Sequence, residues 1–343
     1  MTTQHLSPLT MLLSRHTRRR TFVTLLGGAA AWPLAARAQH GERMRRIGVL
    51  NSSAENDSQA QSFVGTFREG LEKLGWNNGR NVTIHIRWSA GDAERLRANA
   101  VELARLKPDV IVGVGGSALL RLKEATQTIP IVFAQVSDPV GGGFVPSLTR
   151  PGGNITGFAL YEYAIVVKWL ELLKQLAPSI DRVAAFYDPD DPTNRGQLPE
   201  IESRAPTFAV QSSAFPVRNA ADITDAIDRF ADRPNGGLLV LPNPVAVVHR
   251  ELIATLAAKH RLPAVYAYRS QVTSGGLASY GVQNIADLYR GAASYVDRIL
   301  KGEKPGELPI QFTTKFELAI NLKAAAALDI PVSLLARTDE VIE

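Results

Sequence analysis

Residues 129–143 read Ile-Pro-Ile-Val-Phe-Ala-Gln-Val-Ser-Asp-Pro-Val-Gly-Gly-Gly, and residues 151–158, after a short loop, read Pro-Gly-Gly-Asn-Ile-Thr-Gly-Phe. The apolar run from Ile131 to Ala134 is bounded by Pro130 and by a Ser-Asp-Pro turn, which predicts a buried parallel strand. Ligands of open α/β sheets bind beyond the carboxyl ends of the strands. Ser137 and Asp138 are therefore candidate ligand contacts, although Asp138 is also a residue type that merely caps a turn.

Apolar runs alternate with segments of helical periodicity on the amino-terminal side of this strand. Strands are expected at 47–50, 82–88 and 109–113, and helices at 59–74, at 93–106 and from Ser117. Segment 82–88 alternates apolar and polar residues, as does a strand with one less buried face. This alternation of strands and helices predicts βα units around a parallel sheet.

The first 38 residues have the pattern of an export signal. Residues 19–23 fit the twin-arginine pattern, an apolar stretch runs from Thr24 to Leu34, and Ala36-Arg37-Ala38 is a small-residue cleavage site. The apolar stretch is too short to cross a bilayer. We therefore expect a periplasmic protein that begins at Gln39 and is exported by the twin-arginine route, with translation starting at Met1 or Met11.

A second series of βα units follows Tyr161. Strands are expected at 183–187, 209–215, 237–241 and 264–269, and helices at 166–176, 221–231 and 248–260; a further helix at 286–300 comes after this series. Without residues 1–38 the chain has about 305 residues, which is too long for one compact core and suits two domains.

Charge and composition exclude several partners and chemistries. The chain has a formal net charge of +5, but residues 1–38 contain five arginines and no acidic residue, so the mature chain has a net charge of zero. No electrostatic case exists for binding nucleic acid or an anionic membrane, and no later apolar run is long enough for stable membrane insertion. The chain has no cysteine, which excludes disulfides, thiolate metal sites, a cysteine nucleophile and a lipid-bearing cysteine.

The turn at residues 113–118, Gly-Val-Gly-Gly-Ser-Ala, could hold an anion on backbone N–H groups at the start of a helix. It resembles a dinucleotide fingerprint only loosely, because it follows the third strand and Phe133 stands where an acidic residue is expected. A ligand carboxylate held by the backbone of Gly116 and the Ser117 hydroxyl fits this turn better.

Enzyme motifs are missing from the sequence. It contains no G-x-S-x-G nucleophile elbow, no H-E-x-x-H and no P-loop. His249 and His260 are eleven residues apart, which is no metal spacing on a helix. The acids at 188, 190 and 191 lie in a proline-rich loop, where turn chemistry is the ordinary role. We assign no catalytic residue, no metal and no cofactor, and catalysis by unrecognised carboxylates stays open.

Several motifs resemble a family of ABC-transporter substrate-binding proteins whose better-known members bind aromatic amino acids. These are residues 129–141, 150–157, 301–305, 314–318 and 334–343, so the resemblance covers essentially the whole mature chain. It implies a type I periplasmic binding protein, an α/β fold of two Rossmann-like βα domains with parallel sheets, joined by a multi-strand hinge. The implied amino-terminal domain comprises 39–160 plus about 275–315, and the carboxyl-terminal domain 161–274 plus about 316–343.

A binding protein of this kind needs polar groups and aromatic rings that converge from both domains. The candidates are Ser52, Ser53, Gly116, Ser117, Ser137 and Asp138 from the first domain, Asp188, Asn243, Tyr268 and Arg269 from the second, and Tyr161 near the hinge. For an amino acid, hydroxyls and backbone amides would hold the carboxylate, and Asp138 or Asp188 would hold the ammonium. Tyr161 or Tyr268 would stack on a side chain, or else pack in the hinge or core.

The resemblance implies a monomeric, non-enzymatic solute-binding component of an ABC importer, with permease and ATPase subunits as partners. Its ligand would be an amino acid or related small carboxylate, captured by hinge closure. The strand ends have few of the side-chain amides and acids that a sugar-binding site requires. A ligand-sensing protein that serves a receptor and an enzyme on the same fold stay open as alternatives.

Overall fold

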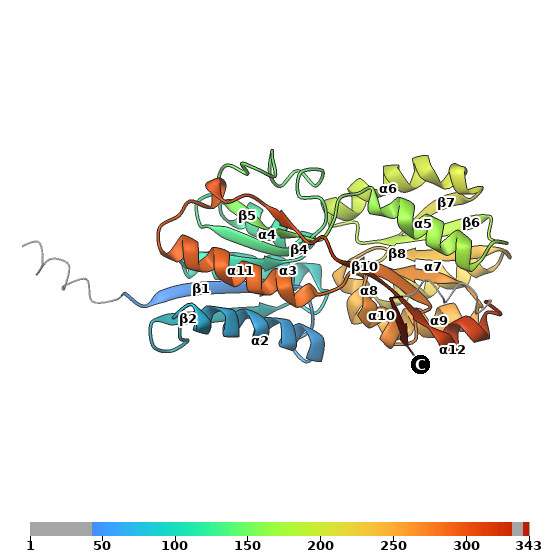
Figure 1. Cartoon of the computed structure of the whole chain (residues 1–343), viewed down its shortest axis with the longest axis horizontal. Coiled ribbons are helices and arrows are strands. Elements are labelled where there is room, and N and C mark those ends of the chain that lie inside the picture. The colour runs from blue at the N-terminus through green and yellow to red at the C-terminus, as the bar shows by residue number, and fades with distance from the viewer. Residues whose placement is uncertain (1–42, 331–338, 343) are drawn as a thin grey trace, which may run out of the picture. The chain divides into compact units, whose positions relative to one another are not determined.

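Strand β4 (Ile131–Val136), which the opening stretch predicts, lies inside a parallel sheet. The computed structural model describes residues 43–330 and 339–342, and among these a sheet of six strands has the order β11-β5-β4-β3-β1-β2 (Figure 1). The other strands are β1 (Arg45–Asn51), β2 (Val82–Trp88), β3 (Val110–Val114), β5 (Ile155–Ala159) and β11 (Gln311–Phe312), and all pair in parallel. Residues 131–134 are fully buried, so the prediction of a buried parallel strand is confirmed.

Two pairs of helices cover the two faces of this first sheet. Helices α2 (Ser58–Lys73) and α11 (Ile285–Leu300) form one buried cluster with the β-strand residues Val49, Val112 and Val132. Helices α3 (Ala93–Arg105) and α4 (Gly116–Ala125) form another buried cluster with Leu50, Ile111 and Phe133, which are the residues adjacent to those three valines in the strands. Successive residues of a strand point to opposite faces, so strands buried on both sides need apolar residues in an unbroken run.

A second sheet of seven strands forms among the described residues, in the order β13-β12-β10-β9-β8-β6-β7. Its strands are β6 (Arg182–Tyr187), β7 (Gln211–Pro216), β8 (Gly236–Val240), β9 (Ala264–Tyr266), β10 (Ala278–Val282), β12 (Phe316–Asn321) and β13 (Glu340–Ile342). All neighbours are parallel except β10 and β12, which are antiparallel. Two sheets of βα units confirm the predicted fold class.

Helices also cover the second sheet. They are α5 (Ile165–Leu176), α6 (Pro192–Arg204), α7 (Ala220–Ala231), α8 (Pro244–Val248), α9 (Arg250–Lys259), α10 (Arg269–Thr273) and α12 (Leu322–Ala327), with 3-10 turns η1 (Ala205–Phe208) and η2 (Pro305–Glu307) elsewhere. The single helix expected at 248–260 is divided at His249, whose ψ of 26° departs from helical geometry. The strand expected at 264–269 ends at Tyr266, because the Gln271 side chain accepts the Tyr268 N–H and α10 begins at Arg269.

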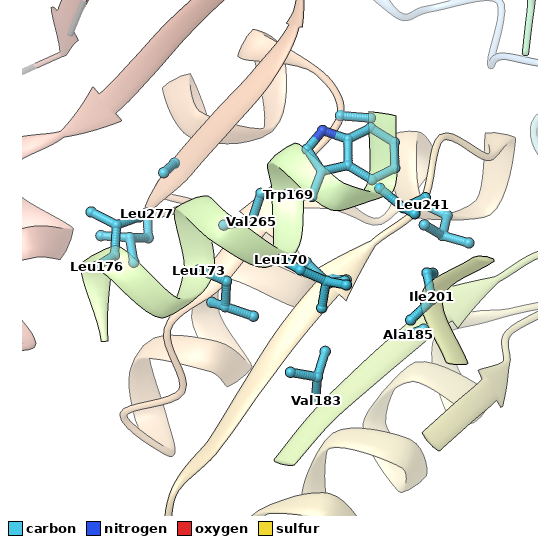
Figure 2. Close-up of a cluster of buried hydrophobic side chains, with 14 of the residues drawn as sticks. Trp169, Leu170, Leu173, Leu176, Val183, Ala185, Ile201, Leu241, Val265 and Leu277 are labelled. Carbon is cyan, nitrogen blue, oxygen red and sulfur yellow. The ribbon is translucent and has the colours of Figure 1, made fainter. Parts of the chain in front are cut away.

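The largest buried cluster of the second sheet is built on α5 (Figure 2). Figure 2 shows Leu170 and Leu173 on the side of α5 that faces the sheet residue Val183, with the Trp169 ring at the other side of the helix. The indole N–H of Trp169 donates to the Tyr280 carbonyl at 2.7 Å. The ring therefore adds apolar area to the core without leaving its polar atom unpaired.

The chain passes between the two sheets three times in its described part, at residues 160–164, 283–284 and 313–315. The Gln283 N–H donates to the Lys315 carbonyl at 3.0 Å, which ties two of the crossings together. The return to the first sheet, expected at about 275, comes later. Strand β10 belongs to the second sheet because Ala278 and Val282 are buried in the α5 cluster, and α11 is the first element back on the first sheet (Figure 1).

Within residues 43–330 and 339–342, none of the helices combines the length and apolar composition that crossing a bilayer demands. The predicted export signal, residues 1–38, lies outside the described residues.

Truncating a core side chain of α5 tests this packing. Leu173→Ala should lower the free energy of unfolding by about 2–5 kcal/mol, because a fully buried leucine loses its contacts and leaves a cavity. Leu172→Ala removes the same atoms from a half-buried neighbour and should cost clearly less. Urea denaturation followed by circular dichroism measures both, and equal losses would contradict the orientation of α5.

Candidate ligand-binding site

A cavity of about 220 Å³ lies where the carboxyl ends of strands from both sheets meet. We call it the cleft cavity. Residues from the first sheet and its helices that line it are Ser52, Ser53, Asp57, Gln59, Ala60, Phe63, Val114, Gly115, Gly116, Gln135, Ser137, Ile285 and Tyr289. Those from the second are Asp191, Thr193, Pro242, Asn243, Pro244, Val247, Tyr268, Arg269, Ser270, Val282 and Glu317, while Gln283 and Asn284 belong to a crossing. Both sheets therefore contribute walls to one site.

Short polar side chains follow the strands of the first sheet at this edge. Ser52 follows β1, and its Oγ donates to the Val114 carbonyl at 3.1 Å. Ser53 donates its backbone N–H to the Asn51 side chain at 2.9 Å, which orders the turn. Gln135 has a φ of 59° at the point where the register of β4 shifts against β5. A bulge of this kind redirects a side chain from the sheet toward a neighbouring space.

Aromatic rings from three elements line the cleft cavity. Phe63 of α2 stacks on Tyr289 of α11 with centroids 5.2 Å apart and an interplanar angle of 21°. Tyr268, just before α10, lines the cavity from the second sheet. Flat apolar surfaces beside polar groups suit a ligand that itself has an aromatic ring.

Acidic side chains outnumber basic ones around the cleft cavity. Asp57, Asp191 and Glu317 line it, and Arg269 is the only lining lysine, arginine or histidine in the described part of the chain. Asp57 caps α2 through the Ala60 N–H at 2.9 Å and pairs with Arg250 at 2.6 Å. Arg269 donates to both carboxylate oxygens of Glu340. The remaining excess of acid favours a ligand that brings a positive group.

The start of α4 faces two carboxylates from the second sheet. The Ser117 hydroxyl donates to Asp188 at 2.8 Å, and Asp191 lies so close to Gly116 that a Cβ atom there would overlap its carboxylate. Burial raises the pKa of Asp188, and burial raises the pKa of Asp191 to about 6 against the effect of its bonds to Thr193. A ligand carboxylate placed on the Gly116–Ser117 turn would meet like charge in this arrangement.

The structure brings seven of the eleven candidate residues to the cleft cavity and places four elsewhere. Ser52, Ser53, Gly116, Ser137, Asn243, Tyr268 and Arg269 line it, whereas Ser117, Asp138, Tyr161 and Asp188 do not. Asn243 also caps α8 through the Ala246 N–H at 2.7 Å. The positions of these residues do not show which of them contact a ligand, so the assignment of each as a ligand-binding residue stays a prediction.

The four candidates outside the lining have identifiable partners or surroundings. Asp138 has a φ of 33°, and its Oδ1 accepts the Gly141 N–H at 2.7 Å, as the turn-capping alternative predicts. Tyr161 is buried edge-on against Trp169, with centroids 5.5 Å apart. Ser117 and Asp188 line a separate cavity of about 30 Å³. Ammonium recognition by Asp138 or Asp188 stays a prediction, and neither residue lines the cleft cavity.

Sequence reasoning missed several lining residues. Phe63 has the helical spacing of a core residue, Tyr289 lies inside a helix, and Glu317 stands at the start of a strand rather than its end. Asp191 has the sequence context of a turn residue. It does hold the turn, because its side chain accepts the Thr193 N–H at 2.8 Å. No group of three or more potential metal ligands occurs among the described residues.

Two βα sheets around a polar and aromatic cavity define the class of two-domain solute-binding proteins. The family model described as "ABC transporter substrate binding protein" matches residues 46–342, and the chain belongs to this family.

Individual relatives agree with this assignment. A tyrosine-binding protein of Clostridioides difficile is 24% identical over 294 residues, which are 84% of this chain and 82% of the relative. A Streptococcus pneumonia ABC domain solved in complex with L-Trp is 25% identical, with a TM-score of 0.78 over 87% of this chain and 99% of that one. A conserved domain protein from Vibrio cholerae is 26% identical, with a TM-score of 0.79 over 87% of this chain and 100% of that one.

The raised pKa of Asp191 predicts a pH-dependent stability. Between its ordinary value of 3.8 and about 6, the folded protein holds a proton that the unfolded chain releases. Stability should therefore fall as the pH rises through this window, by up to about 3 kcal/mol for this residue.

Asp191→Asn should flatten the profile while keeping an acceptor for the Thr193 N–H, and Asp188 should retain a slope in the same direction. Urea denaturation at pH values from 4 to 7.5 measures this dependence. Parallel profiles for the wild type and the variant would contradict it.

Proposed function

We propose that the protein is the extracytoplasmic binding component of an ABC importer and that it binds an aromatic amino acid in the cleft cavity. The observation that carries this proposal is the combination of stacked Phe63 and Tyr289 with Tyr268 and an excess of acid in one cavity. The rings suit an aromatic side chain, and the acids suit an ammonium group. A ligand with only a carboxylate would gain nothing from the acids.

Hydroxyl and amide groups supply the remaining recognition in this proposal. Ser53 and Ser137 line the cleft cavity from the first sheet, and Asn243 and Ser270 from the second. Such groups bind a carboxylate without the cost of burying another full charge. Relatives named for tyrosine binding and solved with L-Trp support an amino acid of this class as the ligand.

Closure around the ligand is part of the proposal. In this proposal the three crossings act as the hinge. Two contacts join the sheets' elements beside the cleft cavity: Ser117 with Asp188 at 2.8 Å and Asp57 with Arg250 at 2.6 Å. A permease would recognise the closed form. A protein that presents the ligand to a receptor would close in the same way. Import and sensing are separated by measuring ATP-driven uptake of the ligand in cells with and without this protein. Import predicts that uptake is lost without the protein, whereas sensing predicts that uptake is unchanged.

Calorimetric titration of the mature protein with L-tyrosine, L-tryptophan, L-phenylalanine and L-leucine tests the proposed ligand class. We expect saturable binding of at least one aromatic amino acid and weaker binding of leucine. Phe63→Ala should weaken the affinity for the aromatic ligand roughly two- to twelvefold, because an aromatic contact contributes about 0.5–1.5 kcal/mol to the binding free energy.

Phe312→Ala, a half-buried phenylalanine outside the cleft cavity, serves as the matched control and should leave affinity unchanged. Equal binding of leucine and the aromatic ligands would contradict the proposed role of the rings. Chemical conversion of the bound amino acid, followed by mass spectrometry, would favour the enzyme alternative.

Export is proposed from the twin-arginine pattern at residues 19–23. Amino-terminal sequencing of the periplasmic protein should find a start at Gln39, and replacing Arg19 and Arg20 by lysine should retain the precursor in the cytoplasm. A periplasmic protein that still begins at Met1 or Met11 would refute cleavage at this site.

A further inference from the structure

Glu317 is a buried carboxylate with an unsatisfied oxygen. It lies near the start of β12, lines the cleft cavity and is 8% exposed. Its Oε1 is buried and has no hydrogen-bond partner within residues 43–330 and 339–342. Burying a carboxylate without a partner costs free energy of folding. A buried carboxylate oxygen without a partner at the wall of a cavity therefore indicates a binding site for a positively charged group.

The other charged groups of the cleft cavity already have partners. Asp57 accepts from the Ala60 N–H and from Arg250, and Arg269 is engaged by both oxygens of Glu340. Asp191 accepts from the backbone and the hydroxyl of Thr193, at 2.8 and 2.7 Å. Glu317 is thus the lining acid with a buried carboxylate oxygen that accepts no hydrogen bond within the described residues.

Strand direction explains how Glu317 reaches this edge. Strand β12 runs antiparallel to β10, so its first residues lie level with the carboxyl end of β10, and Glu317 stands opposite Gly281. Opposed residues project to the same face, and no side chain stands opposite Glu317 because the Ala267 carbonyl occupies the place of a Gly281 Cβ atom. Val282 and Gln283, the next residues along, line the cleft cavity too.

Electrostatics agree with this geometry. Burial raises the pKa of Glu317, and the negative charge of Glu340 raises it further, while the Arg269 guanidinium acts in the opposite direction. A cation bound beside Glu317 would offset both the burial and the like charge.

We propose that Glu317 receives the ammonium group of the bound amino acid and thereby discriminates amino acids from aromatic acids of the same shape. This inference rests on the proposed function, because it concerns the same cavity and ligand class. A charge-assisted hydrogen bond to a desolvated ammonium is among the strongest polar contacts that a protein makes.

Paired ligands that differ only in the ammonium group test the inference. Wild type, Glu317→Gln and Asp191→Asn are each titrated with L-tryptophan and indole-3-propanoate, and with L-tyrosine and 3-(4-hydroxyphenyl)propanoate. In the wild type the amino acid should bind far more tightly than its partner. Glu317→Gln should reduce that ratio roughly tenfold or more, and it should reduce it by clearly more than Asp191→Asn, which tests the rival acid of the lining.

The outcomes separate this inference from the proposed function. No binding of any aromatic amino acid to the wild type would overturn both. Binding with an unchanged ratio in Glu317→Gln, or with a ratio lost in Asp191→Asn instead, would overturn only the role of Glu317.

The stability of the unliganded variant separates recognition from a structural role. Removing a buried charge that has no hydrogen-bond partner within the described residues should leave the melting temperature of Glu317→Gln unchanged or higher. A lower melting temperature together with equal weakening of both ligands of a pair would show that Glu317 instead holds Arg269, and would overturn the inference.

Discussion

Parallel pairing of buried strands is the constraint on which the rest of this structure depends. Neighbouring parallel strands must be entered from the same edge of the sheet, so a crossover connection, in most cases here a helix, has to carry the chain back. All the turns that follow the strands therefore collect at one edge, and these turns contain Ser52, Gly115 and Ser137 in the first sheet. The second sheet brings Pro242 and Tyr268 to the cavity by the same rule. The cleft cavity is a consequence of strand direction before any side chain is considered.

The antiparallel pair β10–β12 is the exception, and it has a distinct effect. It lets the chain leave the second sheet at Val282 and re-enter it at Phe316 close to the same place. Two crossings can then lie side by side, as the bond between Gln283 and Lys315 shows. It also brings the start of a strand, with Glu317, to an edge otherwise made of strand ends. Two of the crossings and part of the polar wall are thus placed by one reversal of direction.

Electrostatic balance in the cleft cavity is achieved locally. Most acidic side chains accept hydrogen bonds from N–H groups of their own turns, and Asp57 also pairs with one arginine, while the net excess of acid in the lining remains. This arrangement limits the desolvation cost that buried ion pairs usually carry. It also explains the raised pKa of Asp188 and Asp191, since hydrogen bonds offset burial there only in part.

The sequence by itself determined the repeating βα plan, most element positions and the turns that carry polar residues. Those features depend on local periodicity and on turn chemistry, which a short window contains. The segment from Ile131 to Ala134 could be identified as a buried strand because its residues are apolar on both faces. Such a strand needs helices over both faces of the sheet, as the structure has. For Asp138 the local pattern left two alternatives, a ligand contact or a turn cap.

Only the tertiary structure decided which polar and aromatic residues face the same space. Phe63 has the spacing of a core residue, and its contact with Tyr289 joins helices more than two hundred residues apart in the chain. Strand β10 belongs to the second sheet because its apolar side chains fit the α5 cluster, which no local pattern reveals. Glu317 reaches the cleft cavity because β12 is reversed. Each depends on contacts between distant segments, and a single sequence does not encode those contacts in any short window.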